Sequence, residues 1–332
     1  GYTARVRLLT PDGHVLGKEK PLLNGNSASG KNKYSQWYCT TFERKSHVKN
    51  VYEQMEDIHA KENIAAFLQK QALPYEAKKI AAKQRVLEYY HEICDVRNAN
   101  VHVSVGGLDS ITLFIFIRDF CHLDVPGISA SILEDKSVQA VHNQLGIETV
   151  KPIKSKTAVI KEFGFPILSK EIAAKIELLQ NPSEDNKTVR HAIITGETGE
   201  YGGWQKNSRM KLSKRWLELF GGYENENEGV NYKTPDFKVS AKCCYYLKEK
   251  PCDDWAKAHN SFPYLGLMAS EGGRRQKALM LHGCNYISPT TVRSAPFAPF
   301  SRQDLLRLAL ELNVPVPEIY GTIERNAKGE YY

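Results

Sequence analysis

The feature that most constrains this chain is a short apolar segment that runs through two glycines into a second, longer apolar segment. Residues 101–110 read VHVSVGGLDS, and the residues that follow read ITLFIFI. The alternating valines predict a strand end, and Gly106 and Gly107 allow a tight turn and a close approach of the backbone to a ligand. Asp109 and Ser110 are residue types that favour a helix start. The pattern therefore predicts a buried strand, a glycine turn and a buried helix.

This turn has two interpretations. The unpaired backbone N–H groups and the positive end of the helix dipole at such a point attract phosphate. Glycine pairs also join strands to helices in α/β proteins for structural reasons alone. The spacing is not that of a Walker loop, since no Gly-Lys-Ser/Thr follows, and it is not G-x-G-x-x-G. The residues alone leave both interpretations open.

The segments after the turn continue an alternation of strands and helices. We expect strands at residues 125–131 and 147–153, with a helix between them that opens at Glu134 and Asp135. This alternation predicts an α/β fold, in which a parallel, Rossmann-like sheet carries helices on both faces. Ligands of such sheets bind beyond the carboxyl ends of the strands at a switch point, which is where the turn at 104–110 falls.

The bulk composition is that of an ordinary globular protein. The chain has 332 residues, of which 42% are hydrophobic and 25% charged, and a formal net charge of +7. No apolar run approaches the roughly 18 residues of a membrane span, and the N-terminus lacks a signal-peptide pattern. Seven cysteines do not suit a secreted disulfide framework. We therefore expect a cytoplasmic protein without membrane contact, whose positive charge suits nucleotide or nucleic acid, or simply a solvated surface.

The sequence predicts four regions along the chain. A small β-hairpin appendage is followed by a helical segment, an α/β nucleotide-binding domain with a polar insertion, and a C-terminal helical region that carries cysteines and arginines and completes the site. Their expected limits are 1–46, 47–95, 96–240 with the insertion at about 181–235, and 241–332.

The insertion contains a basic and aromatic part. Its residues are Lys206, Arg209, Lys211, Lys214 and Arg215, with Trp204 and Trp216. Basic groups beside stacking rings suit nucleic acid. A helix that buries its tryptophans explains the same residues, and this second interpretation is the one we prefer from the sequence.

Cysteines and arginines gather in the last third of the chain. The cysteines are Cys243, Cys244, Cys252 and Cys284, and the adjacent arginines are Arg274 and Arg275. Clustered thiols in a reduced compartment form metal or redox sites more often than disulfides, whereas a free cysteine is also a common small core residue. No paired Cys-x-x-Cys decides between these alternatives. Two neighbouring guanidiniums can hold phosphate or sulfate through bidentate hydrogen bonds.

Taken in order, these segments resemble one known family. The turn is similar to the pyrophosphate loop Ser-Gly-Gly-x-Asp-Ser of the ATP pyrophosphatases and the phosphoadenosine phosphosulfate (PAPS) reductase family, with Val105 in place of the first serine and Ser104 one place earlier. Relatives share, in the same order, Gly-x-Pro-x-x-Ser-Lys (here ending at Lys170), Cys-Cys-x-x-x-Lys-x-Lys-Pro, Met-Ala-x-Glu-Ser with a following arginine, Gly-Cys-Asn and a Tyr-Gly ending. In the third of these, Gly272 replaces the serine. The resemblance covers about residues 85–325.

The resemblance implies a sheet of the adenine nucleotide α-hydrolase (HUP) type that binds ATP or PAPS together with Mg²⁺. The nucleotide-binding residues that it implies are Ser104, Gly106, Gly107, Asp109, Ser110, Ser131 and Lys242. The catalytic residues that it implies are Asp109, Lys170, Arg274 and Arg275. It also implies a 4Fe-4S cluster or zinc at Cys243, Cys244 and Cys284, with Cys252 as a further candidate.

The implied activity is sulfur transfer or reduction at the phosphate end of an adenine nucleotide. One alternative is an ATP pyrophosphatase that thiolates nucleic acid. Another is a nucleotide- or nucleic-acid-binding subunit without turnover, which works with partner proteins or with copies of itself. Sulfonucleotide reductases carry a catalytic cysteine in a C-terminal Glu-Cys-Gly segment, whereas the last cysteine here is Cys284. Thioredoxin-linked reduction by this chain alone is therefore not expected.

Overall fold

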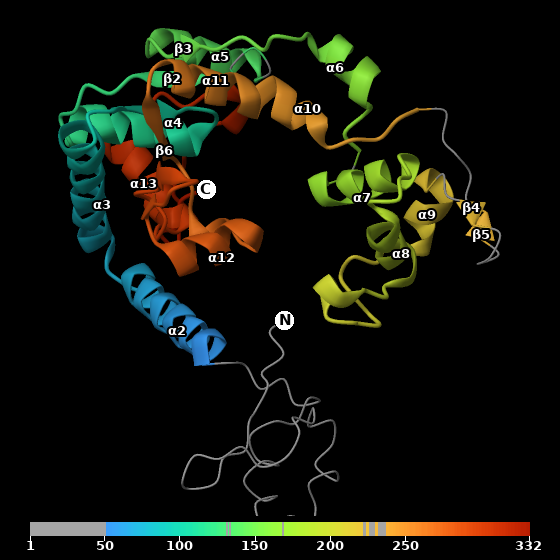
Figure 1. Ribbon diagram of the computed structural model, residues 1–332. Coiled ribbons are helices and arrows are strands. Elements are labelled where there is room, and N and C mark those ends of the chain that lie inside the picture. The colour runs from blue at the N-terminus through green and yellow to red at the C-terminus, as the bar shows by residue number, and fades with distance from the viewer. Residues whose placement is uncertain are drawn as a thin grey trace, which may run out of the picture. The chain divides into compact units, whose positions relative to one another are not determined.

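A computed structural model gives the architecture of the chain (Figure 1). It describes residues 51–130, 132, 134–167, 169–221, 224–225, 230–231 and 237–332. The chain divides into two compact units, Gly1–Ala66 and Phe67–Tyr332. The hairpin expected at 1–46 lies outside the described residues. In the described part of the chain, no helix combines the length and the apolar character that crossing a membrane would need.

The larger unit is organised around a six-stranded sheet with the order β3-β2-β1-β6-β8-β7. Neighbouring strands are parallel except for β7 and β8, which are antiparallel. The predicted α/β fold is confirmed, and the predicted parallel sheet is mostly parallel, with β7 as an antiparallel strand at its edge. The strands are β1 (Asn100–Ser104), β2 (Gly127–Ser129), β3 (Glu148–Thr149), β6 (Ser261–Leu265), β7 (Asn285–Ile287) and β8 (Val292–Ser294).

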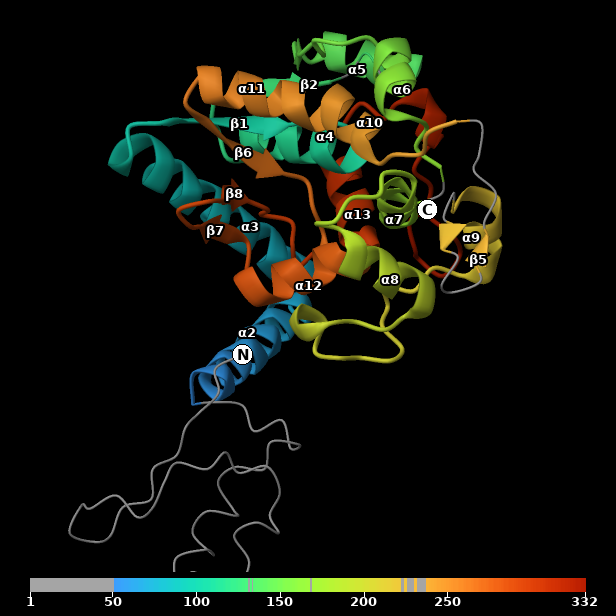
Figure 2. The same ribbon diagram turned by 45° about the vertical axis from the view of Figure 1, so that its right-hand side comes forward.

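Helices cover both faces of this sheet. On one face, Tyr264 of β6 donates its hydroxyl to the carbonyl of Val86 at 2.8 Å, which fixes α3 (Tyr75–Tyr90) against the strands. On the other face, His102 of β1 packs edge-on against Trp255, with the ring centroids 5.4 Å apart, so α11 (Lys250–Ala258) covers that side. Figure 2 shows α11 on one side of β1 and β6 and α3 on the other.

The segment after β1 folds as the sequence predicts. Helix α4 (Leu108–Ile115) continues as a π-helix over Phe116–Phe120. The next helix, α5 (Lys136–Gln144), begins after Asp135, whose carboxylate accepts the N–H of Ser137 at 2.8 Å. This is a side-chain cap at the helix start, as expected for that residue type.

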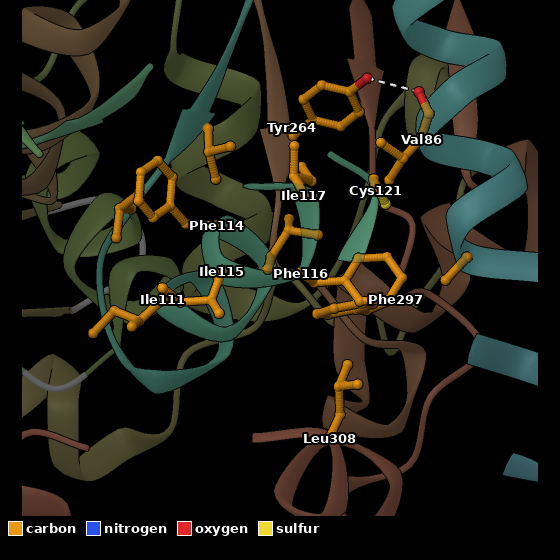
Figure 3. Close-up of a cluster of buried hydrophobic side chains, with 14 of the residues drawn as sticks. Val86, Ile111, Phe114, Ile115, Phe116, Ile117, Cys121, Tyr264, Phe297 and Leu308 are labelled. Carbon is orange, nitrogen blue, oxygen red and sulfur yellow. Dashed lines mark hydrogen bonds between the residues drawn. The ribbon is translucent and has the colours of Figure 1, made fainter. Parts of the chain in front are cut away.

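The main core lies between the sheet and the helices α3, α4 and α13 (Arg302–Glu311). Figure 3 shows side chains of this core, including Ile111, Phe116, Tyr264, Phe297 and Leu308. These five side chains are fully buried, and each contributes on the order of 1.5–3 kcal/mol relative to an exposed position. The almost completely apolar run of α4 is thereby explained, because this helix is enclosed by the core.

The remaining helices form two further clusters. The described residues of the predicted insertion pack against one another. Buried side chains of α8 (Lys187–Thr195) and α9 (Lys214–Phe220) contact those of α7 (Lys170–Gln180). The third cluster contains Leu279 of α12 (Gly273–His282) and Cys284. The elements are α6 (Lys156–Phe163), α7 (Lys170–Gln180), α8 (Lys187–Thr195), α9 (Lys214–Phe220), the antiparallel pair β4 (Glu224–Asn225) and β5 (Val230–Asn231), α10 (Lys242–Cys244) and α12 (Gly273–His282).

The C-terminal region is more than the helical region that the sequence predicts. Strands β6, β7 and β8 all follow residue 240, so this region supplies three of the six strands of the sheet. The expected domain limit at 240 thus falls within the elements of a single sheet. The direct pairing of Asn100 with Ser261 and of Ser104 with Leu265 joins the two parts of the chain at the centre of the sheet.

Candidate functional site

A cavity of about 340 Å³ opens at the carboxyl ends of β1 and β6. Its size lies in the usual range of small-molecule sites. We call it the β1–β6 pocket. Its lining residues are Ser104, Gly106, Gly107, Leu108, Asp109, Ser110, Leu265, Gly266, Leu267, Glu271, Arg275, Arg302 and Tyr320.

The pocket lies at the switch point of the sheet. From β1 the chain moves outward through β2 to β3, whereas β6, which arrives much later in the sequence, lies on the other side of β1. The connections leave β1 in opposite directions, which opens a crevice at the carboxyl ends of β1 and β6. The predicted position of a ligand at the turn after β1 therefore coincides with a real cavity.

The glycine turn is held by the hydroxyl of Ser110. That oxygen accepts the N–H of Gly106 at 2.7 Å and donates to the carbonyl of Gly107 at 2.9 Å. Gly107 has φ −84°, so the turn does not require left-handed backbone there. A Cβ on Gly107 would lie 2.4 Å from the hydroxyl of Tyr320, so a side chain at this position would make the 47% exposed tyrosine turn aside.

The first N–H groups of α4 remain open at the pocket. Among the described residues, no acceptor is found for the N–H groups of Gly107, Leu108 and Asp109. Their residues line the cavity. A helix N-terminus with unpaired N–H groups and its positive dipole end favours an anion, so the pocket has the backbone features of a phosphate site.

Two ion pairs lie in the same pocket. Arg302 donates from Nη1 to Oδ1 of Asp109 at 2.6 Å, and Arg275 donates from Nη1 to Oε2 of Glu271 at 2.7 Å. Burial raises the pKa of Asp109, while the neighbouring guanidinium of Arg302 opposes that rise. The four charged side chains cancel formally. An entering anion therefore meets two guanidiniums that already have carboxylate partners, together with the open backbone N–H groups and the helix dipole.

His142 of α5 contacts the glycine turn through a hydrogen bond to the backbone of Gly106. The side chain is fully buried, and its Nε2 lies 2.8 Å from the carbonyl oxygen of Gly106. Burial lowers the pKa of His142, so the ring is neutral and Nε2–H donates to that carbonyl. Nδ1 has no partner among the described residues. The bond fixes the direction of the Gly106 peptide at the pocket.

Most residues that the sequence singles out near the turn come together here. Ser104, Gly106, Gly107, Asp109, Ser110 and Arg275 all line the β1–β6 pocket. Val105, which stands where the resembled family has serine, is 5% exposed and donates its N–H to the carbonyl of Ile128 at 2.8 Å. It continues the pairing with β2 and belongs to the core.

Two predicted site residues lie wholly or partly outside the described part of the structure. Ser131 lies outside the described residues. Arg274 falls in α12, but its side chain is outside the described part of the structure. The basic contribution from α12 that can be described is therefore that of Arg275.

The lysines predicted for the site lie elsewhere. Lys170 lines a second cavity of about 330 Å³ together with Cys243 and Cys244, and it forms an ion pair with Glu249. Lys242 pairs with Glu177 at 2.7 Å. Ser169, the neighbour of Lys170, caps α7 by accepting the N–H of Ile172 at 3.2 Å. The structure does not bring these residues to the β1–β6 pocket.

The four candidate metal-binding cysteines are not brought together either. Cys243 and Cys244 line the second cavity, whereas Cys284 is buried in the cluster around Leu279. Cys252 lies in α11. In the described residues, no group of three or more His, Cys, Asp or Glu could hold a metal ion. The four cysteines therefore do not fit the iron–sulfur or zinc site that the resemblance implies.

Sequence reasoning missed Arg302, Tyr320 and Gly266 as pocket residues. One signal was present for Arg302. It is the first residue of α13, directly after the N-cap Ser301, and a cation at a helix N-terminus is disfavoured by the helix dipole. A positive charge in that position indicates that the side chain interacts with a group outside its own helix, and here that group is the carboxylate of Asp109. Tyr320 belongs to the Tyr-Gly ending that the resemblance includes, whereas Gly266 carries no comparable signal.

Comparison of the chain with protein-family models, with curated proteins and with solved structures finds no significant match. The fold and the β1–β6 pocket define it as an α/β protein with a mostly parallel sheet and a polar cavity at the switch point of that sheet.

Proposed function

We propose that the β1–β6 pocket binds the phosphate end of an adenine nucleotide, ATP or an adenylyl sulfate. The chain would then be a PAPS reductase-like protein with a HUP-type sheet. One observation carries this proposal: Arg275 lines the same cavity as the glycine turn, although the two are far apart in the sequence. Both belong to the ordered segments that resemble the family.

The residues of the pocket suit the parts of such a ligand. The N–H groups of Gly107, Leu108 and Asp109 would receive phosphate oxygens, with Ser104 and Ser110 at the same edge. Arg275 and Arg302 would give some of their hydrogen bonds to the phosphate in place of the carboxylates, since a guanidinium can bind either group through two parallel hydrogen bonds. Backbone donors that are fixed before the ligand arrives are the most effective stabilisers of developing negative charge.

The carboxylates of the pocket fit the usual environment of Mg²⁺, which proteins hold through one or two carboxylates together with the phosphates of the substrate. Asp109 and Glu271 are the side chains that would hold it. When bound with the nucleotide, Mg²⁺ neutralises phosphate charge. Asp109 has a second role that the described contacts support, because its bond to Arg302 orients that guanidinium in the pocket.

The reaction that the resemblance implies is cleavage of the ATP α–β phosphate bond or handling of an adenylyl sulfate, so that sulfur is transferred or reduced. Among the described residues, no cysteine lines the β1–β6 pocket. A thiol for sulfur chemistry would therefore have to come from outside this pocket. The same observation favours the second candidate, a nucleotide-binding subunit without turnover.

Calorimetric titration with pyrophosphate, ATP and PAPS tests the proposal. We expect binding, and we expect Arg275→Gln to weaken it about ten- to hundredfold, because hydrogen bonds to charged groups contribute roughly 1.5–3 kcal/mol. Arg97→Gln is the matched control, since Arg97 is a half-exposed arginine paired with Glu92 at 2.8 Å outside the pocket.

Failure of all three ligands to bind, or equal effects of the two arginine variants, would contradict the proposal. Pyrophosphate release from ATP, measured with the same protein, separates an enzyme from a binding subunit.

A further inference from the structure

The loop between α8 and α9 displays two large aromatic side chains to solvent. We call residues 198–205 the aromatic loop; its segment is yellow-green in Figure 1. Tyr201 is 107% exposed and Trp204 is 74% exposed. Tyrosine and tryptophan normally bury most of their ring surface. Trp204 thus contradicts the preferred interpretation of a helix that buries its tryptophans, whereas Trp216 of α9 packs on the second core cluster and fulfils it.

The aromatic loop is closed by its own hydrogen bonds. Thr198 donates its N–H to the carbonyl of Gln205 at 2.9 Å, and its Oγ1 accepts the N–H of Gln205 at 2.8 Å. The same hydroxyl donates to the carbonyl of Gly202 at 2.9 Å. A Cβ on Gly202 would lie 2.4 Å from Cβ of Thr198. The loop is therefore compact and needs glycine at this position.

Trp204 has a left-handed backbone conformation, which residues other than glycine and asparagine seldom adopt. Its φ is +53°, and its N–H donates to the carbonyl of Gly199 at 3.2 Å. Left-handed backbone costs a bulky residue on the order of 1–2 kcal/mol. The surrounding bonds maintain a strained residue whose ring lies in solvent, which is the pattern of a surface prepared for a ligand.

The surroundings of the aromatic loop are strongly basic. Between residues 187 and 218 the sequence holds seven lysines and arginines against three glutamates, one of which pairs with Lys214. Lys206, Arg209 and Lys211 are exposed, and within the described part of the chain no carboxylate pairs with them. Unpaired cations beside exposed rings attract a polyanion that also offers flat apolar surfaces.

We propose that the aromatic loop and these three cations form a binding surface for single-stranded nucleic acid. Tyr201 and Trp204 would stack on unpaired bases, and the cations would contact phosphates. A duplex hides its base faces, so it would engage the cations without the rings. This surface shares no residue with the β1–β6 pocket and is independent of nucleotide binding there.

Fluorescence anisotropy with labelled oligo(dT), and with a duplex of the same length, tests this surface on the full chain. Trp204→Asn removes the ring and keeps the backbone, because asparagine tolerates positive φ. Trp204→Tyr keeps a stacking ring. Tyr332→Ala is the control, since Tyr332 is an aromatic residue 64% exposed outside the loop.

We expect Trp204→Asn and Tyr201→Ala each to weaken oligo(dT) binding about tenfold or more, Trp204→Tyr to retain it, and Tyr332→Ala to leave it unchanged. Lys206→Ala should reduce the slope of log affinity against log salt by about 1. Duplex binding should not respond to Trp204→Asn. Absence of oligo(dT) binding at low salt, or equal affinity of Trp204→Asn and Tyr332→Ala for oligo(dT), would overturn the proposal. Titration of Trp204→Asn with ATP reports separately on the β1–β6 pocket.

Discussion

Gly266 lies where β6 approaches the first turn of α4 most closely, and replacing it with alanine tests this approach. It follows Leu265, the last residue of β6. A Cβ at this position would lie 2.8 Å from the backbone N and Cα of Ser110 and 3.0 Å from the carbonyl carbon of Asp109. Since these neighbours are backbone atoms of the first turn of a helix, they cannot swing aside as the end of a long side chain could. The strand and the helix would have to separate.

We expect Gly266→Ala to lower the free energy of unfolding by about 1–3 kcal/mol, the usual cost of forcing a methyl group into a packed site. The φ of Gly266 is not in the left-handed region, so no conformational strain adds to this value. Alanine also restricts the unfolded chain more than glycine does, and this effect raises the free energy of unfolding by at most about 1 kcal/mol. Urea unfolding followed by circular dichroism measures the change.

Gly106→Ala is the matched control from the same pocket. There the nearest atom to a new Cβ is Oγ of Ser110 at 3.8 Å, an ordinary contact. We expect its stability to stay within about 1 kcal/mol of the parent chain. If both alanine variants unfold at the same urea concentration, β6 and α4 do not approach as closely as described, and the account of the pocket that they enclose is wrong.

Two further predictions concern Gly107 and His102. Gly107→Ala places a Cβ 2.4 Å from the hydroxyl of Tyr320, so a double-mutant cycle of Gly107→Ala with Tyr320→Phe should show a favourable coupling of roughly 0.5–1 kcal/mol in unfolding free energy; zero coupling would exclude the contact. Burial lowers the pKa of His102 to about 4, so the folded chain keeps this ring neutral while the unfolded chain protonates it near pH 6.5. Stability should therefore fall by about 3 kcal/mol as the pH drops from about 6.5 to about 4. His102→Gln should lose this part of the pH dependence in urea titrations, and an unchanged slope would refute the assignment.

Features of the fold that depend on local rules were predictable from the sequence. The strand, glycine turn and apolar helix around residues 100–115 follow from residue types that are close in sequence. The same holds for α13, where Ser301 and Asp304 form a reciprocal capping box. In each case the hydrogen bond that begins the helix joins residues three or four apart, so the sequence contains both partners.

The central strand β6 was not predicted, and its sequence explains why. It reads SFPYL, with Pro263 in the interior of the sheet. Proline lacks an N–H for the ladder and normally argues against a central strand. Here β8 pairs with β6 only at Tyr264, opposite Ser294, so the missing donor is tolerated. The partner of β1 could be identified only from the three-dimensional arrangement.

The candidate site divides in a similar way. Arg275 was predicted because an ordered set of segments connects it to the glycine turn, and the cavity contains it. The same ordered set predicted Lys170, Lys242 and the cysteines at this site, and the structure gives them other surroundings. Order along a chain does not specify distance. Arg302 shows the converse, because its contact with Asp109 links residues far apart that share no motif.

The β1–β6 pocket is assembled from segments that lie between Ser104 and Tyr320 in the sequence. During synthesis, β1 emerges from the ribosome long before β6 and α13, so the edge of β1 that pairs with β6 stays unpaired until β6 has been made. A nascent chain that ends before Arg302 lacks the guanidinium next to Asp109. On the proposed function, nucleotide binding would be a late event that requires the completed sheet, and the nucleotide would stabilise only chains that have finished folding.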